Sequence, residues 1–353
     1  MGANEMAPLW IRRPNDYLAS IALTLLAAAC SLGPAPAGTA RHASVGFAPL
    51  ATAEPSLSAT IPVQNLSTEM NGEAAASSDP RPAVTRATIT QISAPAVLPA
   101  ATATATPDLR PLPAAWRTWP VVPSLSPNLA LIFQTGQALG NDPHAFSVIG
   151  DCQSALPVFM GIFSTDWYWL GAGYERLQGT IDYFNGSGSF ERQSYSVQNG
   201  LSVASVLSPA WADPQVCEEG ETPIDCEFRL HRPSIVFINL GTNWTANAAA
   251  SHEAYLRQIV EVVIGYGAIP VLSTKGDNVE GDWGINQSIA RVAYEYDLPL
   301  WNFWLATQDL PGRGLDPERP GGNYLTPAAW DRRSFTGLQV LDRIQTSLLE
   351  VIP

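Results

Sequence analysis

The sequence predicts an α/β domain built on a mainly parallel sheet, with helices covering both faces of the sheet. From residue 116 onward, short continuous apolar runs alternate with longer segments whose apolar residues recur at helical spacing. A strand with one solvated face would alternate polar and apolar residues, so the continuous runs indicate a buried parallel sheet. Hydrophobic residues make up 46% of the chain, which is enough for one large core.

Capping and turn signals delimit the elements along the chain. Ser126 and Pro127 match a helix cap followed by a first-turn proline, and this helix is expected to end at Gly140. The strongest strand is expected at 234–240, where the sequence reads SIVFINL. The other expected elements are a strand at 145–150, a helix around 173–184, a helix at 251–266, a strand at 269–273, a helix at 283–296, a strand at 298–303 and a helix at 337–351.

The first thirty residues are typical of an export signal. Two arginines precede an apolar run at 18–29, and Cys30 follows it directly. As a helix this run would span about 18 Å, too short for a hydrocarbon core of about 30 Å, so a cleaved secretory signal is the better interpretation. The ending LAAAC resembles a bacterial lipobox, although Ala27 stands where Leu, Val or Ile is preferred. We expect a lipid on Cys30; an ordinary signal peptide cleaved nearby is the alternative.

Three regions follow from composition: a signal peptide at 1–30, a tether at 31–115 and a folded domain at 116–353. The tether is rich in Ala, Pro, Thr and Ser and has no sustained period, so we expect it to be disordered. The domain would then lie at the cell surface or in the periplasm, with its lipid as the membrane contact. The net charge of −13 excludes nucleic acid as the main partner, because the phosphate backbone would repel the chain.

Cysteine spacing predicts one disulfide. Cys217 and Cys226 enclose a short acidic loop, and in an oxidising compartment they form the natural pair; two reduced surface thiols are the alternative. If Cys30 carries lipid, Cys152 is left over. No histidine lies at ligand spacing from these cysteines, so neither a metal nor another cofactor is expected.

Three loops are expected at the carboxyl ends of the strands, where parallel sheets bind their ligands. Cys152 follows the first strand, Gly200 follows an extended stretch at 189–197, and Asn243 follows the strand at 234–240. A nucleophile, a glycine N–H and a side-chain amide are the parts of an oxyanion hole. We therefore predict Cys152 at the nucleophile position, with oxyanion donors from the Cys152 N–H, the Gly200 N–H and the Asn243 amide.

These loops resemble the first three blocks of the SGNH/GDSL hydrolases. The matching stretches are FSVIGDCQS at 146–154, Asn-Gly at 199–200 and VFINLGTNW at 236–244. The resemblance extends over most of 145–351. It implies a three-layer α/β/α sandwich of flavodoxin-like type and the hydrolysis of esters, often acyl groups on lipids or carbohydrates.

The chain departs from the family at four positions. Cys152 replaces the nucleophilic serine, and Trp244 stands where an aspartate usually follows the asparagine. The last family block is Asp-x-x-His, and in the matching stretch Gly321 replaces the aspartate and Tyr324 the histidine. Without this base and its carboxylate, the serine-type mechanism lacks two of its parts.

No other histidine is a strong substitute for the missing base. His144 and His231 precede their strands and belong to the opposite edge of the sheet, and His42 lies in the tether. His252 is expected on the catalytic side, at the start of a helix, and we interpret it as a solvent-facing first-turn residue.

The residues leave two functional hypotheses open. In the first, the protein is an ester hydrolase or acyl transferase that uses Cys152, since a thiol needs less help from a base than a hydroxyl does. In the second, the domain is catalytically inactive and binds glycan or acylated envelope material in the same cleft. Trp167 and Trp244 are candidate substrate-binding residues in either case, with ordinary packing as the alternative. A purely structural surface protein would show neither activity.

Overall fold

The structure is a computed structural model that describes residues 110–243 and 248–351. The predicted signal peptide, Cys30, the predicted tether to residue 109 and Trp244 lie outside the described residues. Within the described part of the chain, no helix combines the length and the apolar character that a membrane span requires.

Four parallel strands form the sheet, and they lie in the same order in space as along the chain. One further residue extends it: Val197 forms a parallel bridge with Gly150, on the side of the first strand that faces away from the second. If the segment around Val197 is counted as a strand, the order becomes 2-1-3-4-5, which is the flavodoxin-like order. The strands are β1 (Asp142–Gly150), β2 (Pro233–Asn239), β3 (Ile269–Ser273) and β4 (Leu300–Trp301).

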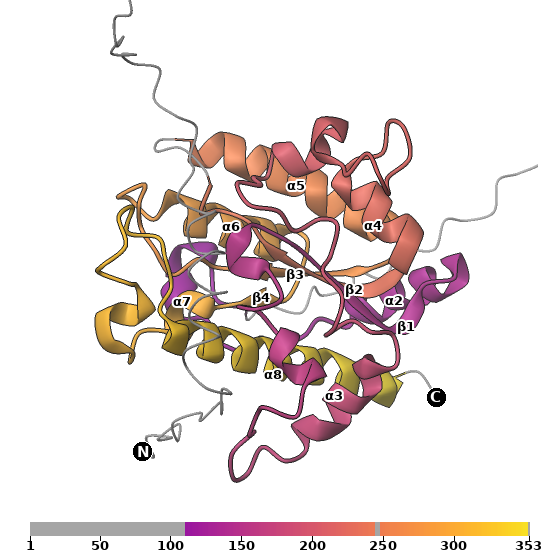
Figure 1. The fold of residues 1–353 in the computed structure, drawn as a ribbon, viewed down its shortest axis with the longest axis horizontal. Coiled ribbons are helices and arrows are strands. Elements are labelled where there is room, and N and C mark those ends of the chain that lie inside the picture. The colour runs from indigo at the N-terminus through magenta and orange to yellow at the C-terminus, as the bar shows by residue number, and fades with distance from the viewer. Residues whose placement is uncertain (1–109, 244–247, 352–353) are drawn as a thin grey trace, which may run out of the picture. The chain divides into compact units, whose positions relative to one another are not determined.

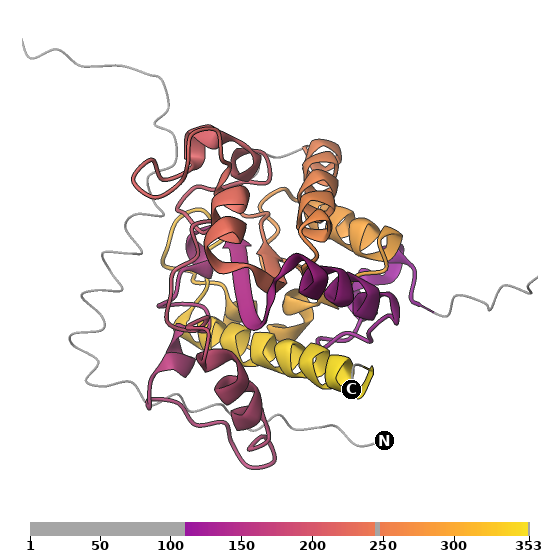
Figure 2. The same cartoon turned by 90° about the vertical axis from the view of Figure 1, so that its right-hand side faces the viewer.

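Helices cover both faces of this sheet (Figure 1). The α-helices are α2 (Asn128–Leu139), α3 (Leu177–Asn185), α4 (Pro223–His231), α5 (Ala249–Gly265), α6 (Gly284–Glu295), α7 (Phe303–Ala306) and α8 (Pro327–Val351). In Figure 2, α3 and α8 lie on one face, and α4, α5 and α6 lie on the other. The predicted α/β class with a parallel sheet and three layers is therefore confirmed.

Two helices begin where the sequence analysis missed a cap. In α4, Thr222 forms a capping box with Asp225, and Pro223 occupies the first helical position. The helix α8 begins at Pro327, ten positions earlier than the expected 337, and Thr326 Oγ1 accepts a hydrogen bond from the Ala329 amide at its start. Both starts carry the same Thr-Pro signal.

One expected strand is much shorter than predicted. The strand expected at 298–303 is reduced to Leu300–Trp301, because Asn302 caps the short helix α7 by accepting a hydrogen bond from the Leu305 amide. The Asn302 amide group also donates to the carbonyls of Trp116 and Trp119, at distances of 2.9 and 2.8 Å. This buried side chain thus ends β4 and holds the start of the described domain against it.

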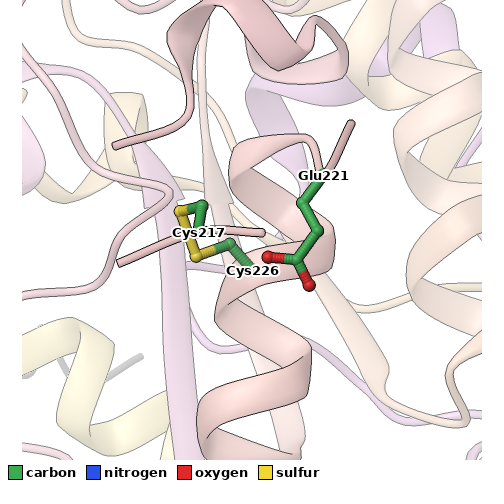
Figure 3. Close-up of side chains that lie close together, drawn as sticks. All are labelled: Cys217, Glu221 and Cys226. Carbon is green, nitrogen blue, oxygen red and sulfur yellow. A yellow bond between two sulfur atoms is a disulfide. The ribbon is translucent and has the colours of Figure 1, made fainter. Parts of the chain in front are cut away.

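The disulfide predicted between Cys217 and Cys226 is present (Figure 3). It joins the loop after residue 216 to the first turn of α4. Glu221, which lies beside the sulfurs in Figure 3, accepts two hydrogen bonds from the Arg229 guanidinium, at 2.6 and 2.9 Å. The same guanidinium donates to the Val216 carbonyl at 3.1 Å. The loop is therefore fixed to α4 by a covalent bond and by an ion pair.

Replacing Cys217 and Cys226 together by alanine is expected to lower the free energy of unfolding by about 2–3 kcal/mol. The bond closes a loop of about ten residues and restricts the unfolded chain, and its removal restores that entropy. Urea unfolding of the oxidised wild type and the double variant measures the difference. An unchanged unfolding midpoint would show that the ion pair alone holds the loop.

Candidate functional site

The segment 192–198 is held against β1 by a buried carboxylate. Glu227 of α4 accepts hydrogen bonds from the Arg192 guanidinium at 2.5 Å, the Ser147 hydroxyl at 2.5 Å and the Tyr195 amide at 2.8 Å. Its side chain is almost fully buried. At the end of β1, Gly150 donates to the Ser196 carbonyl at 3.0 Å and accepts from the Gln198 amide at 3.2 Å. The chain therefore leaves this segment at the carboxyl edge of the sheet.

Gly200 and Asn243 meet at this edge. Gly200 has a φ of +80°, in the left-handed region that favours glycine, and it turns the chain just after the bridge to β1. Beyond β2, the Asn243 side-chain amide donates to the Leu201 carbonyl at 3.2 Å. The loop after β2 is thereby joined to the residue that follows Gly200.

Asp151 joins the loop after β1 to the loop after β2. One carboxylate oxygen accepts a hydrogen bond from the Gln153 amide at 2.9 Å, which caps the short turn Cys152–Ser154, and the carboxylate also interacts with the Thr242 side chain. The structure thus brings the segments of Cys152, Gly200 and Asn243 to one edge. Their roles as nucleophile and oxyanion donors stay predictions.

Gln153 brings the stretch 321–324 to the same edge. Its carboxamide donates to the Asn323 carbonyl at 3.3 Å and accepts from the Trp330 indole at 3.2 Å. Its backbone carbonyl accepts from the Arg333 guanidinium at 2.5 Å. These bonds connect the turn that carries Cys152 to the first two turns of α8.

A buried acid, Asp151, and a buried base, Arg333, line the same small cavity beneath this edge. Burial raises the pKa of Asp151 to about 6, and the nearby Arg333 guanidinium opposes this rise without cancelling it. Burial also lowers the pKa of Arg333 to about 10. The Arg333 guanidinium lies over the rings of Phe159 and Phe303, at 5.2 and 5.3 Å from their centroids. Asp151 is therefore a buried structural group, not a solvated catalytic one.

The space under the edge is small. A cavity of about 20 Å³ lies among Asp151, Asn239, Asn323 and Arg333, enough for a water molecule but not for an ester substrate. Lys275 also lines it, and its ammonium group is bonded to two buried carboxylates of the same loop, Asp277 at 2.6 Å and Glu280 at 2.5 Å. A larger ligand has to bind outside this cavity, on the rim, by which we mean the surface formed by the loops at the carboxyl edge of the sheet.

One group of possible metal ligands occurs in the described part of the chain, at Cys217, Glu221 and Cys226 (Figure 3). Their ligand atoms lie within 4.8 Å of one another. The two sulfurs are bonded to each other and Glu221 is paired with Arg229, so these residues do not offer a thiolate site.

Comparisons with known proteins give structural similarity alone. No family model matches the chain, and no curated protein matches its sequence significantly. A candidate SGNH hydrolase from Slackia heliotrinireducens is similar in structure, with 12% identity, a TM-score of 0.39, and coverage of 55% of this chain and 97% of that one. A GDSL-like lipase from Bacteroides thetaiotaomicron is similar with 14% identity, a TM-score of 0.35, and coverage of 61% and 98%.

The arrangement of the domain itself is more informative than these scores. Its flavodoxin-like strand order and the meeting of the three blocks at one carboxyl edge are what the sequence resemblance implies. The described domain has an α/β fold with the flavodoxin-like strand order that the resemblance to the SGNH/GDSL hydrolases implies. Within that fold, the catalytic positions differ from the family pattern as follows.

Cys152, which the sequence analysis predicts at the nucleophile position, is disulfide-bonded. The described residues contain no free thiol. The expectation that this cysteine is left over is therefore wrong, because spacing along the chain does not show which sulfurs can meet. In this oxidised form the sulfur is not a nucleophile.

A buried tyrosine stands at the position that the sequence resemblance matches to the family histidine. Tyr324 is 7% exposed, and the Arg319 guanidinium lies 3.5 Å above its ring. Three residues earlier, Gly321 has a φ of +106°, and a Cβ atom there would lie 3.0 Å from Asn323 Oδ1. An aspartate at 321 would therefore be strained.

His252 does not face solvent, contrary to the sequence-based expectation. It is fully buried, with Nδ1 2.9 Å from the Ser288 hydroxyl and Nε2 3.4 Å from the Leu240 carbonyl. Burial lowers its pKa to about 4, so it is neutral near pH 7. The prediction was wrong because a residue's place in the first turn of a helix does not reveal which other elements pack on its side chain. Here the loop after β2 and the helix α6 cover His252.

The other two described histidines are also held away from Cys152. His144 lies near the amino end of β1, where its Nδ1 is 3.1 Å from the Tyr183 carbonyl. His231 ends α4 and stacks on the Tyr195 ring with centroids 6.0 Å apart. Both positions agree with the expectation from strand direction.

The tryptophan that lies beside the site is one that the sequence analysis missed. A Cβ atom at Gly200 would be 3.8 Å from the Trp211 ring, and Trp211 is 37% exposed. Trp167 is more exposed, at 48%, and lies in the loop before α3; its predicted role in substrate binding stays a prediction. The sequence did contain a signal for Trp211, namely a tryptophan in a proline-containing loop soon after Gly200.

Replacing Asp151 by asparagine is expected to flatten the pH dependence of stability between pH 4 and 7. The pKa of Asp151 is higher in the folded chain than in the unfolded chain, so its contribution to stability is full below pH 4 and is lost as the pH rises through 6. Relative to wild type, the variant should gain about 2 kcal/mol on going from pH 4.5 to pH 7. Urea unfolding at the two pH values measures this gain.

The comparison uses the difference between pH values because Asp151→Asn also changes packing and hydrogen bonding at this position. That part of the cost does not depend on pH, whereas the Arg333 interaction is already contained in the pKa of Asp151. Parallel stability profiles for the two proteins would show that Asp151 is ionised with an ordinary pKa in the folded state.

Proposed function

We propose that this SGNH-like domain does not hydrolyse esters and instead binds a ligand, glycan or acylated envelope material, at the carboxyl edge of its sheet. The observation that carries the proposal is the pair Gly321 and Tyr324. The first is a left-handed glycine and the second a buried tyrosine beneath Arg319, where an SGNH hydrolase needs aspartate and histidine.

The state of the other catalytic positions supports the same conclusion. A nucleophile at this site requires a base within hydrogen-bonding reach. The three histidines in the described ranges 110–243 and 248–351 are bonded or stacked elsewhere, and Cys152 is disulfide-bonded. A ligand at the rim would therefore meet backbone N–H groups and amide side chains but no activated nucleophile.

The second candidate function is ester hydrolysis by Cys152 after reduction. It is favoured by the meeting of the segments that carry Cys152, Gly200 and Asn243, because an oxyanion hole needs that arrangement. The two functions differ in one measurable respect, the dependence of turnover on the Cys152 thiol.

Hydrolysis of p-nitrophenyl acetate by the full chain distinguishes them. With and without a phosphine reductant, we expect the wild type to release p-nitrophenol no faster than Cys152→Ala, because no base activates a nucleophile at this edge. The variant is a matched control, since it keeps Cys217 and Cys226 and hence the background reaction of their thiols. Turnover that appears on reduction and is at least about tenfold above the variant would establish the hydrolase instead.

A protein that binds envelope material has to be exported, and we propose that the chain is held at a membrane by lipid on Cys30, at the cell surface or in the periplasm. In that anchored form the Cys30 sulfur is a thioether and takes no part in a disulfide. The support is the sequence pattern at 18–30. Expression in a bacterium with a labelled fatty acid should label the wild type but not Cys30→Ser, and the wild type should partition into detergent. Equal labelling of both proteins, or of neither, would contradict the anchor.

A further inference from the structure

A groove of about 750 Å³ includes Trp211, whose ring would lie 3.8 Å from a Cβ atom at Gly200. Its walls are residues 192–198, residues 210–214 and His231 at the end of α4. The Trp211 ring forms the part of the wall nearest to Gly200. The groove is within the size range of small-molecule sites, and unlike the cavity under Asp151 it is large enough for an organic ligand.

We infer that this groove binds a neutral carbohydrate chain, with the Trp211 indole as a stacking surface for a sugar ring. The inference rests on the proposed function, because it takes the edge of the sheet to bind rather than to hydrolyse its ligand. It adds the place and the chemical class of the ligand.

Three rings line the groove. Trp211 is 37% exposed, although an indole is among the largest apolar surfaces in a protein, and it ends a short turn that begins at Pro209. Tyr195 and His231 lie nearly parallel, with an interplanar angle of 7°. Aromatic faces pack against the C–H faces of sugars, and the polar tips of tyrosine and histidine remain available to hydroxyl groups.

The charges in the groove favour a neutral ligand. Arg192 is paired with the buried carboxylate of Glu227 at 2.5 Å, so its charge is compensated. Burial lowers the pKa of His231, and the Arg192 charge acts in the same direction while Glu227 opposes both, so the imidazole is neutral near pH 7. The remaining carboxylate is that of Asp213. An anionic polymer would gain nothing here and would meet a chain of net charge −13.

Polar side chains along the walls suit a ligand that is rich in hydroxyl groups. Gln193 and Gln198 both line the groove, and a carboxamide can donate and accept hydrogen bonds at the same time. Gln198 Nε2 also donates to the Trp211 carbonyl at 2.7 Å, which fixes the backbone that carries the indole. An acyl chain could use none of the hydrogen-bonding capacity that remains on these carboxamides, so it fits the groove less well than a sugar does.

The wall that carries Trp211 is held in place before any ligand binds. The Val216 and Cys217 amides donate to the Asp213 carbonyl at 3.1 and 2.8 Å, and the Cys217–Cys226 disulfide ties this turn to α4. The other wall is fixed to β1 through Glu227. A preformed groove lowers the entropy cost of binding a flexible chain.

Affinity electrophoresis of the full chain, in native gels that contain a neutral polysaccharide, tests the inference. The probes are β-glucan, xylan and mannan. We expect at least one of them to retard the wild type, and Trp211→Ala to raise the dissociation constant about tenfold or more, because it removes the stacking surface. Trp211→Phe should have a smaller effect. Trp167→Ala is the matched control, since it removes an even more exposed indole outside the groove, and its retardation should equal that of the wild type.

Each other outcome overturns the inference. Retardation that is unchanged in Trp211→Ala, or lost only in Trp167→Ala, would place carbohydrate elsewhere and leave the proposed function standing. Binding to phosphatidylcholine vesicles with none to the three polysaccharides would exclude carbohydrate as the ligand class, as would the absence of binding to every probe. Failure of the proposed function itself is seen separately, as Cys152-dependent turnover of p-nitrophenyl acetate.

Discussion

The parallel bridge between Gly150 and Val197 is the contact on which the candidate site depends. Two backbone hydrogen bonds, from Gly150 to Ser196 and from Gln198 to Gly150, set the segment 192–198 beside the end of β1. Without these bonds Gly200 would have no defined place at the edge that carries Cys152. The wall of the groove that contains Trp211 would also lose its support, because the Trp211 carbonyl is bonded to Gln198. The buried Glu227 stabilises the same contact from α4, because it binds one residue of β1 and two of the segment.

A second constraint lies in the buried polar groups beneath the edge. Asp151, in the loop after β1, and Arg333, in the closing helix, place opposite charges in the interior, where each alone would be costly, and the two charges interact electrostatically. Gln153 adds hydrogen bonds between the same two parts. An edge held by buried polar contacts of this kind can keep its shape after a catalytic base is lost, and it can then serve a binding function.

The sequence determined the fold better than it determined the site. The strands β2 and β3 were predicted within a residue or two because an apolar run bounded by polar residues and glycine has few alternatives. The blocks at 151, 200 and 243 could be placed at one edge because parallel strands share a direction. The burial of His252 and the burial of Asp151 near Arg333 could not be predicted, because both depend on packing between distant elements. Trp211 was overlooked because exposure cannot be read from residue type. The start of α8 was predicted ten residues too late because its Thr-Pro cap follows a glycine-rich stretch.

Hydrogen exchange at the Gln198 amide tests the central claim most directly. This amide donates to the Gly150 carbonyl, so in the folded protein it should exchange slowly, on the time scale of the amides of Val236 and Ile238 in β2. The Gly200 amide is a useful internal reference, since it lies just beyond the bridge in an exposed turn. If the Gln198 amide exchanges as fast as an exposed loop while β2 stays protected, the segment 192–198 does not pair with β1, and neither the rim nor the groove exists as described.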